Sequence, residues 1–303
     1  MNASEPDARR IQVLIVTGHD HFHHRWRAST ARFRDVLEQH PHFEVRVTEA
    51  FDGATARTLE PFDVVLLNYF GAIRPASTEK RWGEETEQAL FDYVRGGGGL
   101  VVMHGAFWMG ATWDSHGDEL LELFGGAMRG VSRRAPGQAV DVHLTQPDHP
   151  ITRGLVVDFV SPVDDKYVNL VVPPDNDITV LADTTDPAEA YLDGAYYAVN
   201  AMPGEKIYDL ESARALPGAD RRHPVSWTKQ YGQGRVFALA IGHVGASTIQ
   251  DAHRGRREGR EIGPTMDVAT RVPQFQTMLV RGTEWAATGA VADRLVEPLD
   301  DSH

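Results

Sequence analysis

The first 125 residues alternate short apolar runs with amphipathic stretches, and this alternation constrains the fold more than any other feature. Four runs have the length and composition of strands: 11–17, 43–50, 63–69 and 100–103. Three stretches have the pattern of helices: one between His24 and Pro41, with Trp26, Thr30, Phe33 and Leu37 on one face, 78–97, and 114–124. Strands that alternate with helices predict a parallel sheet covered on both faces.

The second half of the chain has more strands and fewer helices. Strand-like segments cover 140–145, 167–172, 178–183, 225–231 and 235–241, and an amphipathic helix covers 273–288. We therefore expect an α/β fold in which a mostly parallel central sheet is extended by antiparallel strands. Two stretches, 186–223 and 245–271, lack periodicity and are expected to be long loops, which are usually functional or mobile. Residues 1–10 and 290–303 are expected to be tails.

The composition suits a folded protein and excludes several kinds of chemistry. Of the 303 residues, 42% are hydrophobic and 24% are charged, which is enough to bury a core. The net charge of −13 argues against binding to nucleic acid or to an anionic membrane surface. The chain has no cysteine, which removes disulfides, thiolate metal sites and cysteine nucleophiles. Because the N-terminal segment is polar and no apolar stretch is long enough for a bilayer, we expect a cytoplasmic protein.

Histidines follow three of the predicted strands. Four of them lie in GHDHFHHRW after the first strand, where one or two are expected to matter: His19, His21, His23 and His24. His104 ends the strand in GGGGLVVMHGA, and His243 follows a late strand in ALAIGH. Parallel strands end at one edge of a sheet, so three histidines could meet there and hold zinc or manganese with a position left open. The alternatives are a solvated loop for the first group, core histidines for the other two, and a general base or nucleophile at His104.

Acidic and aromatic residues near strand ends are further candidates. In the sequence DDKY, Asp165 and Tyr167 could act as general acid or base, and Asp164 could accept a sugar hydroxyl. A solvated turn leading into a strand is the alternative for this segment. Four other side chains near strand ends could contact a sugar ring, although aromatic residues more often belong to the core: Asn68, Tyr69, Trp108 and Trp113. Five arginines could form a local positive rim: Arg25, Arg27, Arg129, Arg133 and Arg134.

These motifs resemble the ThuA-like (trehalose-utilisation) family, a branch of the class I glutamine-amidotransferase-like superfamily. The resemblance is carried by VLIVTG followed by HHRW, FDVVLLNYFG, YVRGGGGLVVMHGAF, PDHPITRGL, DDKY, PVSWTKQYGQGRVFALAIGH and FQTMLVRGTEWAATG. It implies a single domain over 11–289 with a flavodoxin-like three-layer fold and insertions near 186–223 and 245–271. The insertions could form a lid or a contact in a homo-oligomer.

The resemblance also implies roles for individual residues. The family's histidines correspond to His24, His104 and His243, and its acid–tyrosine motif corresponds to Asp164, Asp165 and Tyr167. Amidotransferases of the superfamily have a cysteine where His104 stands, so glutamine hydrolysis through a thioester is not expected.

The family is linked to the catabolism of trehalose and related disaccharides through 3-keto sugars. A bound divalent metal and a base that removes the proton beside the ketone would permit elimination, isomerisation or hydrolysis. The alternatives are a non-catalytic carbohydrate-binding or regulatory module, and a metal-dependent hydrolase of another small polar substrate.

Overall fold

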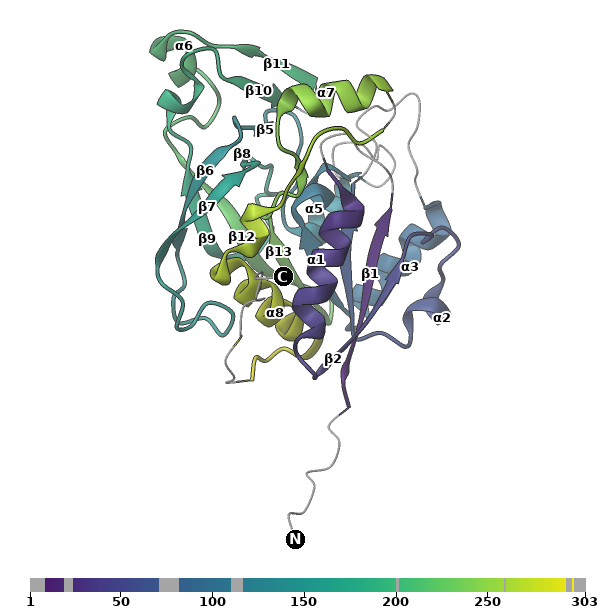
Figure 1. Ribbon diagram of the computed structural model, residues 1–303. Helices are drawn as coiled ribbons and strands as arrows, with labels where there is room; N and C mark the ends of the chain where they lie inside the picture. The colour runs from purple at the N-terminus through teal and green to yellow at the C-terminus, as the bar shows by residue number, and fades with distance from the viewer. Residues whose placement is uncertain are drawn as a thin grey trace.

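The computed structural model describes residues 9–18, 24–70, 82–109, 117–199, 202–258, 260–292 and 296. A nine-stranded sheet runs through the molecule in the order β2-β1-β3-β4-β13-β12-β9-β6-β7 (Figure 1). Its strands are β1 (Ile11–Gly18), β2 (Phe43–Thr48), β3 (Val64–Tyr69), β4 (Gly99–Met103), β6 (Gln138–Leu144), β7 (Asp158–Asp164), β9 (Ile178–Thr185), β12 (Arg222–Tyr231) and β13 (Gly234–Leu239). The strands from β2 to β13 pair in parallel, and those from β13 to β7 pair antiparallel.

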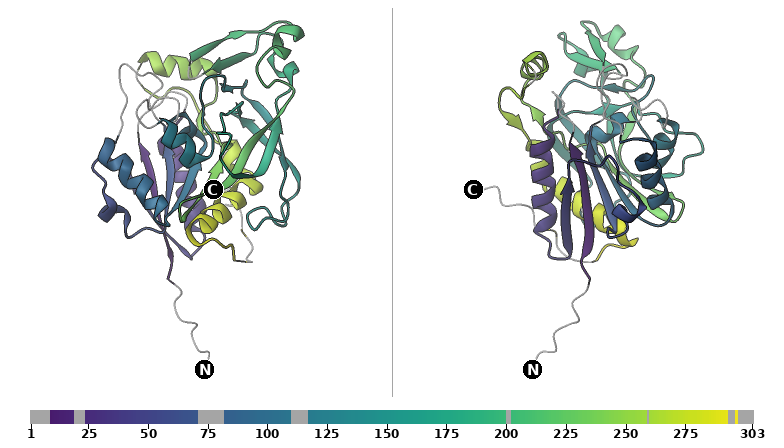
Figure 2. Two further views of the ribbon diagram at one scale, coloured as in Figure 1. Left: turned by 180° about the vertical axis from the view of Figure 1, so that it is seen from behind. Right: turned by 90° about the vertical axis from the view of Figure 1, so that its right-hand side faces the viewer.

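Helices cover both faces of the parallel part of the sheet, which gives three layers (Figure 2). On one face lie α1 (Trp26–Glu38) and α8 (Pro273–Thr288), and on the other lie α2 (Ala56–Leu59), α3 (Glu84–Arg95) and α5 (Gly117–Phe124). Alternate residues of β1 enter the two cores, with Val13 and Ile15 facing α1 and Leu14 and Val16 facing the other side. The expected α/β fold, with a parallel sheet extended by antiparallel strands, is therefore confirmed.

A smaller sheet lies above the ends of the main strands (Figure 1, top). Its order is β11 (Met202–Lys206), β10 (Tyr196–Val199), β5 (Arg133–Arg134) and β8 (Tyr167–Val168). Two short strands, β14 (Gly245–Ala246) and β15 (Thr265–Met266), pair beside α7 (Ile249–Glu258). The remaining elements are the short helices η1 (His104–Trp108), η2 (Ala188–Tyr191), α6 (Leu210–Arg214) and η3 (Val268–Arg271).

The structure corrects the prediction that 186–223 and 245–271 are long loops. The first stretch contains η2, β10, β11, α6 and the start of β12, and the second contains β14, α7, β15 and η3. All of these elements except α7 and β12 have five residues or fewer, too few to show a period in the sequence. The helix α7 is longer, but its sequence IQDAHRGRRE is mostly polar and charged and contains too few apolar residues to show a helical period.

Three smaller differences have local causes. The helix expected over 78–97 begins at Glu84, after the non-helical Gly83, and the one expected over 114–124 is described from Gly117. The strand expected over 167–172 ends at Val168, because Asn169 has a left-handed backbone (φ 56°). The edge strand β7 was missed, since its sequence DFVSPVD contains a proline, which normally argues against a strand interior.

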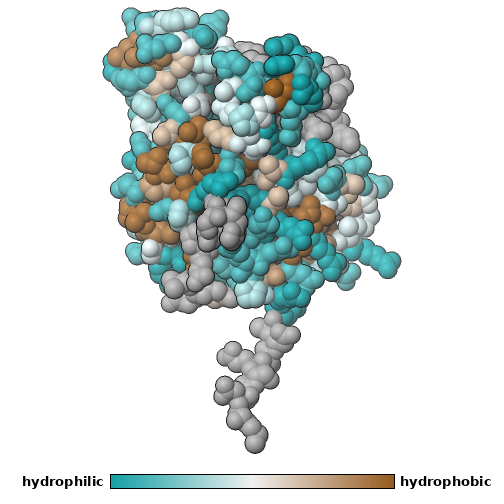
Figure 3. Space-filling view, viewed as in Figure 1, coloured by the Kyte–Doolittle hydropathy of each residue, from teal (hydrophilic) through white to brown (hydrophobic). Residues whose placement is uncertain are grey.

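The edge strand β7 and the turn before it expose apolar side chains. Val156, Val157, Val160 and Val163 are exposed, and Figure 3 shows hydrophobic residues gathered on this side of the molecule. The expected homo-oligomer and the single-domain bounds stay predictions. Among the described residues, no helix has the length and apolar character needed to cross a bilayer.

The close contact between α8 and β13 gives a test of the packing. A Cβ at Gly282 would lie 2.1 Å from Cδ1 of the buried Phe237. Alanine gains about 1 kcal/mol over glycine in a helix, but overpacking a core costs about 1–3 kcal/mol. We expect Gly282→Ala to lower the free energy of unfolding, measured by urea titration and circular dichroism. A stability equal to or above that of the parent protein would contradict this packing.

Candidate functional site

The histidines predicted at three strand ends lie together because their strands are parallel neighbours. His104 is the first residue of η1 directly after β4, and His243 lies just beyond β13. His24 lies between β1 and α1 and forms an isolated bridge with Gly245. The order β1-β3-β4-β13 brings all three to one edge of the sheet, below the smaller sheet.

His24, His104, His243 and Asp165 form one cluster, which we call the histidine cluster. Each offers one nitrogen or oxygen atom, and these atoms all lie within 4.8 Å of one another. Nε2 of His104 and Oδ2 of Asp165 each lie 3.3 Å from Nδ1 of His243. The His24 ring centroid lies 5.2 Å from that of His104 and 5.0 Å from that of His243. Four other positions from the sequence prediction lie outside the described residues: His19, His21, His23 and Trp113.

His104 is held in one orientation. Its backbone has a positive φ of 27°, which non-glycine residues seldom adopt, at the turn from β4 into η1. Its Nδ1 lies 2.7 Å from the carbonyl oxygen of Ala240, which can only accept, so the proton sits on Nδ1 and Nε2 is left for the cluster. Tyr167 stacks on the same ring at a centroid distance of 4.5 Å. Histidines that bind metals commonly donate their other N–H in this way.

Asp164 connects the acidic segment to the His243 loop. Its carboxylate accepts from the backbone N–H groups of Asp165 (2.8 Å), Gly242 (2.8 Å) and His243 (3.0 Å), and from the Ser161 hydroxyl (2.8 Å). It is completely buried. The structure therefore gives Asp164 a supporting role in place of the expected sugar contact.

Opposite charges and burial define the protonation states beside the cluster. Asp165 forms an ion pair with Arg134 (2.8 Å). Although burial opposes the charged form, this carboxylate raises the pKa of Arg134. Burial lowers the pKa of His243 to about 4, against the opposing effect of Asp165. His243 is therefore neutral near pH 7, the form that binds metal ions.

The remaining predicted residues lie under or behind the cluster. The Tyr167 hydroxyl lies 3.3 Å from Nε2 of His24, and burial raises the pKa of Tyr167 well above 10. Trp108 packs edge-on against Tyr167, and Tyr69 packs against Trp82. Asn68 donates from Nδ2 to the hydroxyls of two α1 residues: Ser29 (2.9 Å) and Thr30 (2.8 Å). These are contacts within the protein, and the expected substrate contacts of Asn68, Tyr69 and Trp108 stay predictions.

Two alternatives from the sequence are wrong. The segment 164–167 is no solvated turn, because all four of its side chains are buried. Arg133 and Arg134 form no exposed positive rim, since both form ion pairs with carboxylates and their side chains are only 1% and 12% exposed. Arg25 is also buried and donates to the carbonyl oxygens of Ile262 and Gly263.

A cavity of about 320 Å³ opens beside the histidine cluster. Its lining includes Arg134, Asp165 and His243. Much of the remaining lining comes from the two stretches expected to be loops, with Ala195, Tyr196, Ser247, Thr248 and Met266 among the residues. Sequence reasoning did not find these wall residues, because nothing in a short strand or turn signals that it faces a cavity.

The comparison with protein families agrees with this arrangement. A family described as ThuA, trehalose utilisation, matches residues 12–256. The chain belongs to the ThuA family. Its membership associates the chain with trehalose utilisation and confirms the resemblance seen in the sequence. The relationship to glutamine amidotransferases stays a prediction.

Solved structures support the same fold. A ThuA-like protein of Parabacteroides merdae is 21% identical, with a TM-score of 0.66 over 95% of this chain and 93% of its own. A ThuA-like protein of Bacteroides uniformis is 18% identical, with a TM-score of 0.60 over 96% and 98%. A cytoplasmic protein of Salmonella typhimurium LT2 is 14% identical, with a TM-score of 0.55 over 91% and 99%. None of the curated proteins matches the chain.

Replacing Asp164 tests its role as the connection between the two segments. Asp164→Asn would put an amide donor against the N–H groups that the carboxylate now accepts from. Since hydrogen bonds to a buried charged group are each worth about 1.5–3 kcal/mol, we expect a loss of at least about 2 kcal/mol in chemical denaturation. The control is Asp158→Asn at the exposed end of the same strand, β7, which should change stability by less than about 0.5 kcal/mol. Equal effects of the two variants would contradict the role of Asp164.

Proposed function

We propose that the protein is a metal-assisted enzyme of carbohydrate catabolism that acts on a 3-keto sugar derived from trehalose or a related disaccharide. The observation that supports this most is the meeting of His24, His104, His243 and Asp165 beside a cavity that the last two residues line. A binding module has no need of three imidazoles and a carboxylate at such short separations. The membership of the ThuA family supports the choice of a carbohydrate as substrate.

The donor atoms fit a divalent metal ion. The 3.3 Å separation between Nε2 of His104 and Nδ1 of His243 equals the edge of a tetrahedron with metal–ligand bonds of about 2.0–2.1 Å. The hydrogen bond from His104 to Ala240 provides the outer support that such ligands commonly have. His24, His104 and His243 would hold the ion, and both zinc and manganese accept imidazole ligands. When bound, a divalent cation would polarise a carbonyl oxygen of the substrate.

Asp165 is the group best placed to move a proton. It lines the cavity, and its ion pair with Arg134 fixes the position of the carboxylate. In the proposed reaction Asp165 accepts the proton from the carbon beside the ketone. For elimination, the bond from the next carbon to its oxygen then breaks, and the protonated Asp165 carboxyl returns the proton to that oxygen. Tyr167 keeps its own proton and holds the His24 ring.

The cavity suits a small, uncharged and hydroxylated ligand. Its volume lies at the lower end of the range of about 300–1,000 Å³ that is usual for small-molecule sites. Tyr196, Ser247 and Thr248 bring hydroxyl groups to its walls. Within the described lining, the cation Arg134 is balanced by Asp165, so the site makes no special provision for an anion.

The first test combines metal content with turnover. We expect the purified protein to hold near-stoichiometric zinc or manganese by elemental analysis, and His104→Ala to lose most of it, because one of three imidazole ligands is removed. The same variant should turn over a 3-keto-disaccharide at least about 100-fold more slowly. His143→Ala, which removes an exposed histidine paired with Asp158, is the matched control and should behave like the parent. Sugar binding without turnover, unaffected by His104→Ala, would favour the non-catalytic module instead.

The second test separates the base from the metal ligands. Asp165→Asn keeps the size of the side chain but cannot accept a proton, so we expect kcat to fall by about 10²–10⁴-fold. The three histidines should still hold near-stoichiometric metal in this variant, although with lower affinity, because Asp165 contacts His243. Full activity would remove Asp165 from the proton transfer, and loss of the metal would make it a ligand.

A further inference from the structure

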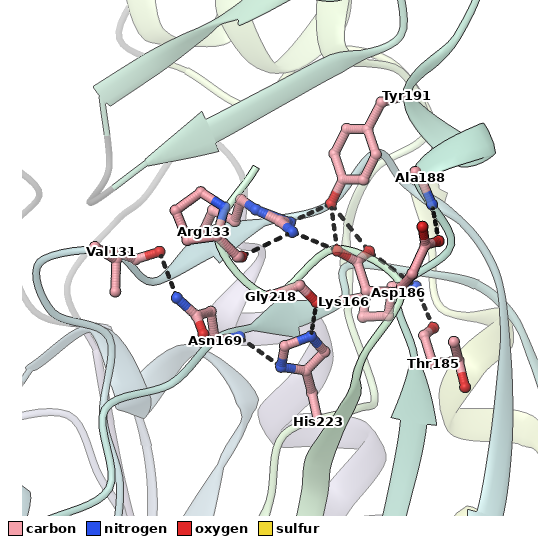
Figure 4. Close-up of polar contacts among 12 residues, drawn as sticks. Val131, Arg133, Lys166, Asn169, Thr185, Asp186, Ala188, Tyr191, Gly218 and His223 are labelled. Carbon is pink, nitrogen blue, oxygen red and sulfur yellow. Dashed lines mark hydrogen bonds and ion pairs between the residues drawn. The ribbon is translucent and has the colours of Figure 1, made fainter. Parts of the chain in front are cut away.

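A second group of buried charges lies on the other side of the segments that carry Arg134 and Asp165. Arg133 and Lys166, the neighbours of those two residues, both meet Asp186 (Figure 4). The distances to the Asp186 carboxylate are 2.5 Å from Nη2 of Arg133 and 3.4 Å from Nζ of Lys166. Lys166 also donates to the carbonyl oxygen of Thr185 (2.9 Å), and Tyr191 donates to Asp186 (3.0 Å). We call Arg133, Lys166, Asp186 and Tyr191 the anchor cluster.

The anchor cluster and the histidine cluster are coupled by the geometry of two very short strands. The residues of β5 are Arg133 and Arg134, and they pair with Val168 and Tyr167 of β8. Successive side chains in a strand point to opposite sides. The Arg133 and Lys166 side chains, which Asp186 holds, therefore fix the direction of their neighbours Arg134 and Asp165. Only a few backbone hydrogen bonds hold such short strands, among them the one from Ala135 to the Lys166 carbonyl (2.8 Å). Side-chain anchors must therefore supply most of the orientation.

The buried charges of the anchor cluster fix the geometry of this segment more than they add to its stability. Arg133, Lys166 and Asp186 are almost completely buried. Burial lowers the pKa of Lys166, and Asp186 opposes this effect. Buried ion pairs add little stability over apolar residues of equal size, but breaking one by removing a partner is costly. Such a cluster restricts the segment to the one arrangement that keeps every charge paired.

Both ends of the segment are fixed as well. Val163 and Asn169, on either side of it, have left-handed backbones with φ of 48° and 56°. The N–H of Asn169 donates to Nδ1 of His223, and Nε2 of His223 donates to the Gly218 carbonyl (Figure 4). The turn that ends β8 is thus tied to the stretch 186–223, which begins at Asp186 and also carries Tyr196 of the cavity wall.

We propose that Lys166 and Arg133 are positioning residues for the histidine cluster, and that through Asp186 they hold Asp165 and Arg134 against His243. This inference rests on the proposed function, because it takes the histidine cluster to be a metal site. Neither residue touches the substrate in this scheme. The same contacts join the stretch that carries Tyr196 of the cavity wall to the segment that carries Asp165. The anchor cluster therefore fixes the position of both the wall and the acid.

Zinc affinity tests the proposal without any assay of turnover. The apo-protein is titrated with Zn²⁺ in competition with a chromogenic chelator. We expect Lys166→Met to bind zinc about 10–100-fold more weakly, the range found when an outer support of a ligand is removed. Lys166→Arg keeps a cation that can reach Asp186, and it should restore most of the affinity. Circular dichroism and thermal unfolding check that each variant is folded.

Lys229→Met is the matched control. Lys229 is another buried lysine, and its Nζ donates to the carbonyl oxygen of Glu122, which is no part of either cluster. Loss of this lysine should lower the Tm without changing the zinc affinity. Parent-like zinc binding by Lys166→Met would overturn the proposal, and so would equal weakening in Lys166→Met and Lys229→Met. If Lys166→Met does not fold, Tyr191→Phe takes its place, with an expected weakening of at least about twofold and unchanged affinity as the contrary result.

The two proposals can fail separately. If the parent protein binds zinc and His104→Ala does not, the metal site is supported independently of the result for Lys166→Met. If the parent binds no zinc, the metal-centred function fails, and crystal structures of the parent and Lys166→Met decide on the anchor. We expect the contact between Asp165 and His243 to be lost only in the variant. The same contact in both structures would overturn the positioning role.

Discussion

The carboxylate of Asp164 is the interaction on which the rest of the site depends. It accepts three backbone N–H groups and one hydroxyl from two segments that are about 80 residues apart in sequence. One of these segments carries Asp165 and Tyr167, and the other carries His243. Because a buried carboxylate must be satisfied by donors, the two segments have one stable relative position. The cluster of three histidines and one acid exists only in that position.

Side chains also alternate in direction along β5 and along the two residues that precede β8. Arg134 and Asp165 face the cavity, whereas Arg133 and Lys166 face Asp186. In each of the dipeptides 133–134 and 165–166, one side chain therefore faces the cavity and the other holds the segment in place. The parallel sheet carries the histidines at its edge, β5 of the smaller sheet carries Arg134, and the connection from β7 to β8 carries Asp165. Neither sheet carries the complete site.

The sequence predicts the parallel half well, because long apolar strands and amphipathic helices have clear periods. The helix 273–288 has the observed bounds, and the positions after β4 and β13 led directly to His104 and His243. The smaller sheet could not be predicted in the same way, because strands of two to five residues are too short to show a period in the sequence. Arg134 lies in a strand of two residues and Asp186 lies directly after β9. Only contacts between distant parts of the chain show that Arg134 pairs with Asp165 and Asp186 with Arg133.

The cavity draws its floor and its walls from different parts of the chain. The floor belongs to the packed edge of the sheet, where almost any replacement disturbs many neighbours. The walls include residues of β10, β14, α7 and β15, which lie outside the nine-stranded sheet. Related proteins could therefore differ in these wall segments, and so in the ligand that fits the cavity, while the histidine cluster at the edge of the sheet stays in place.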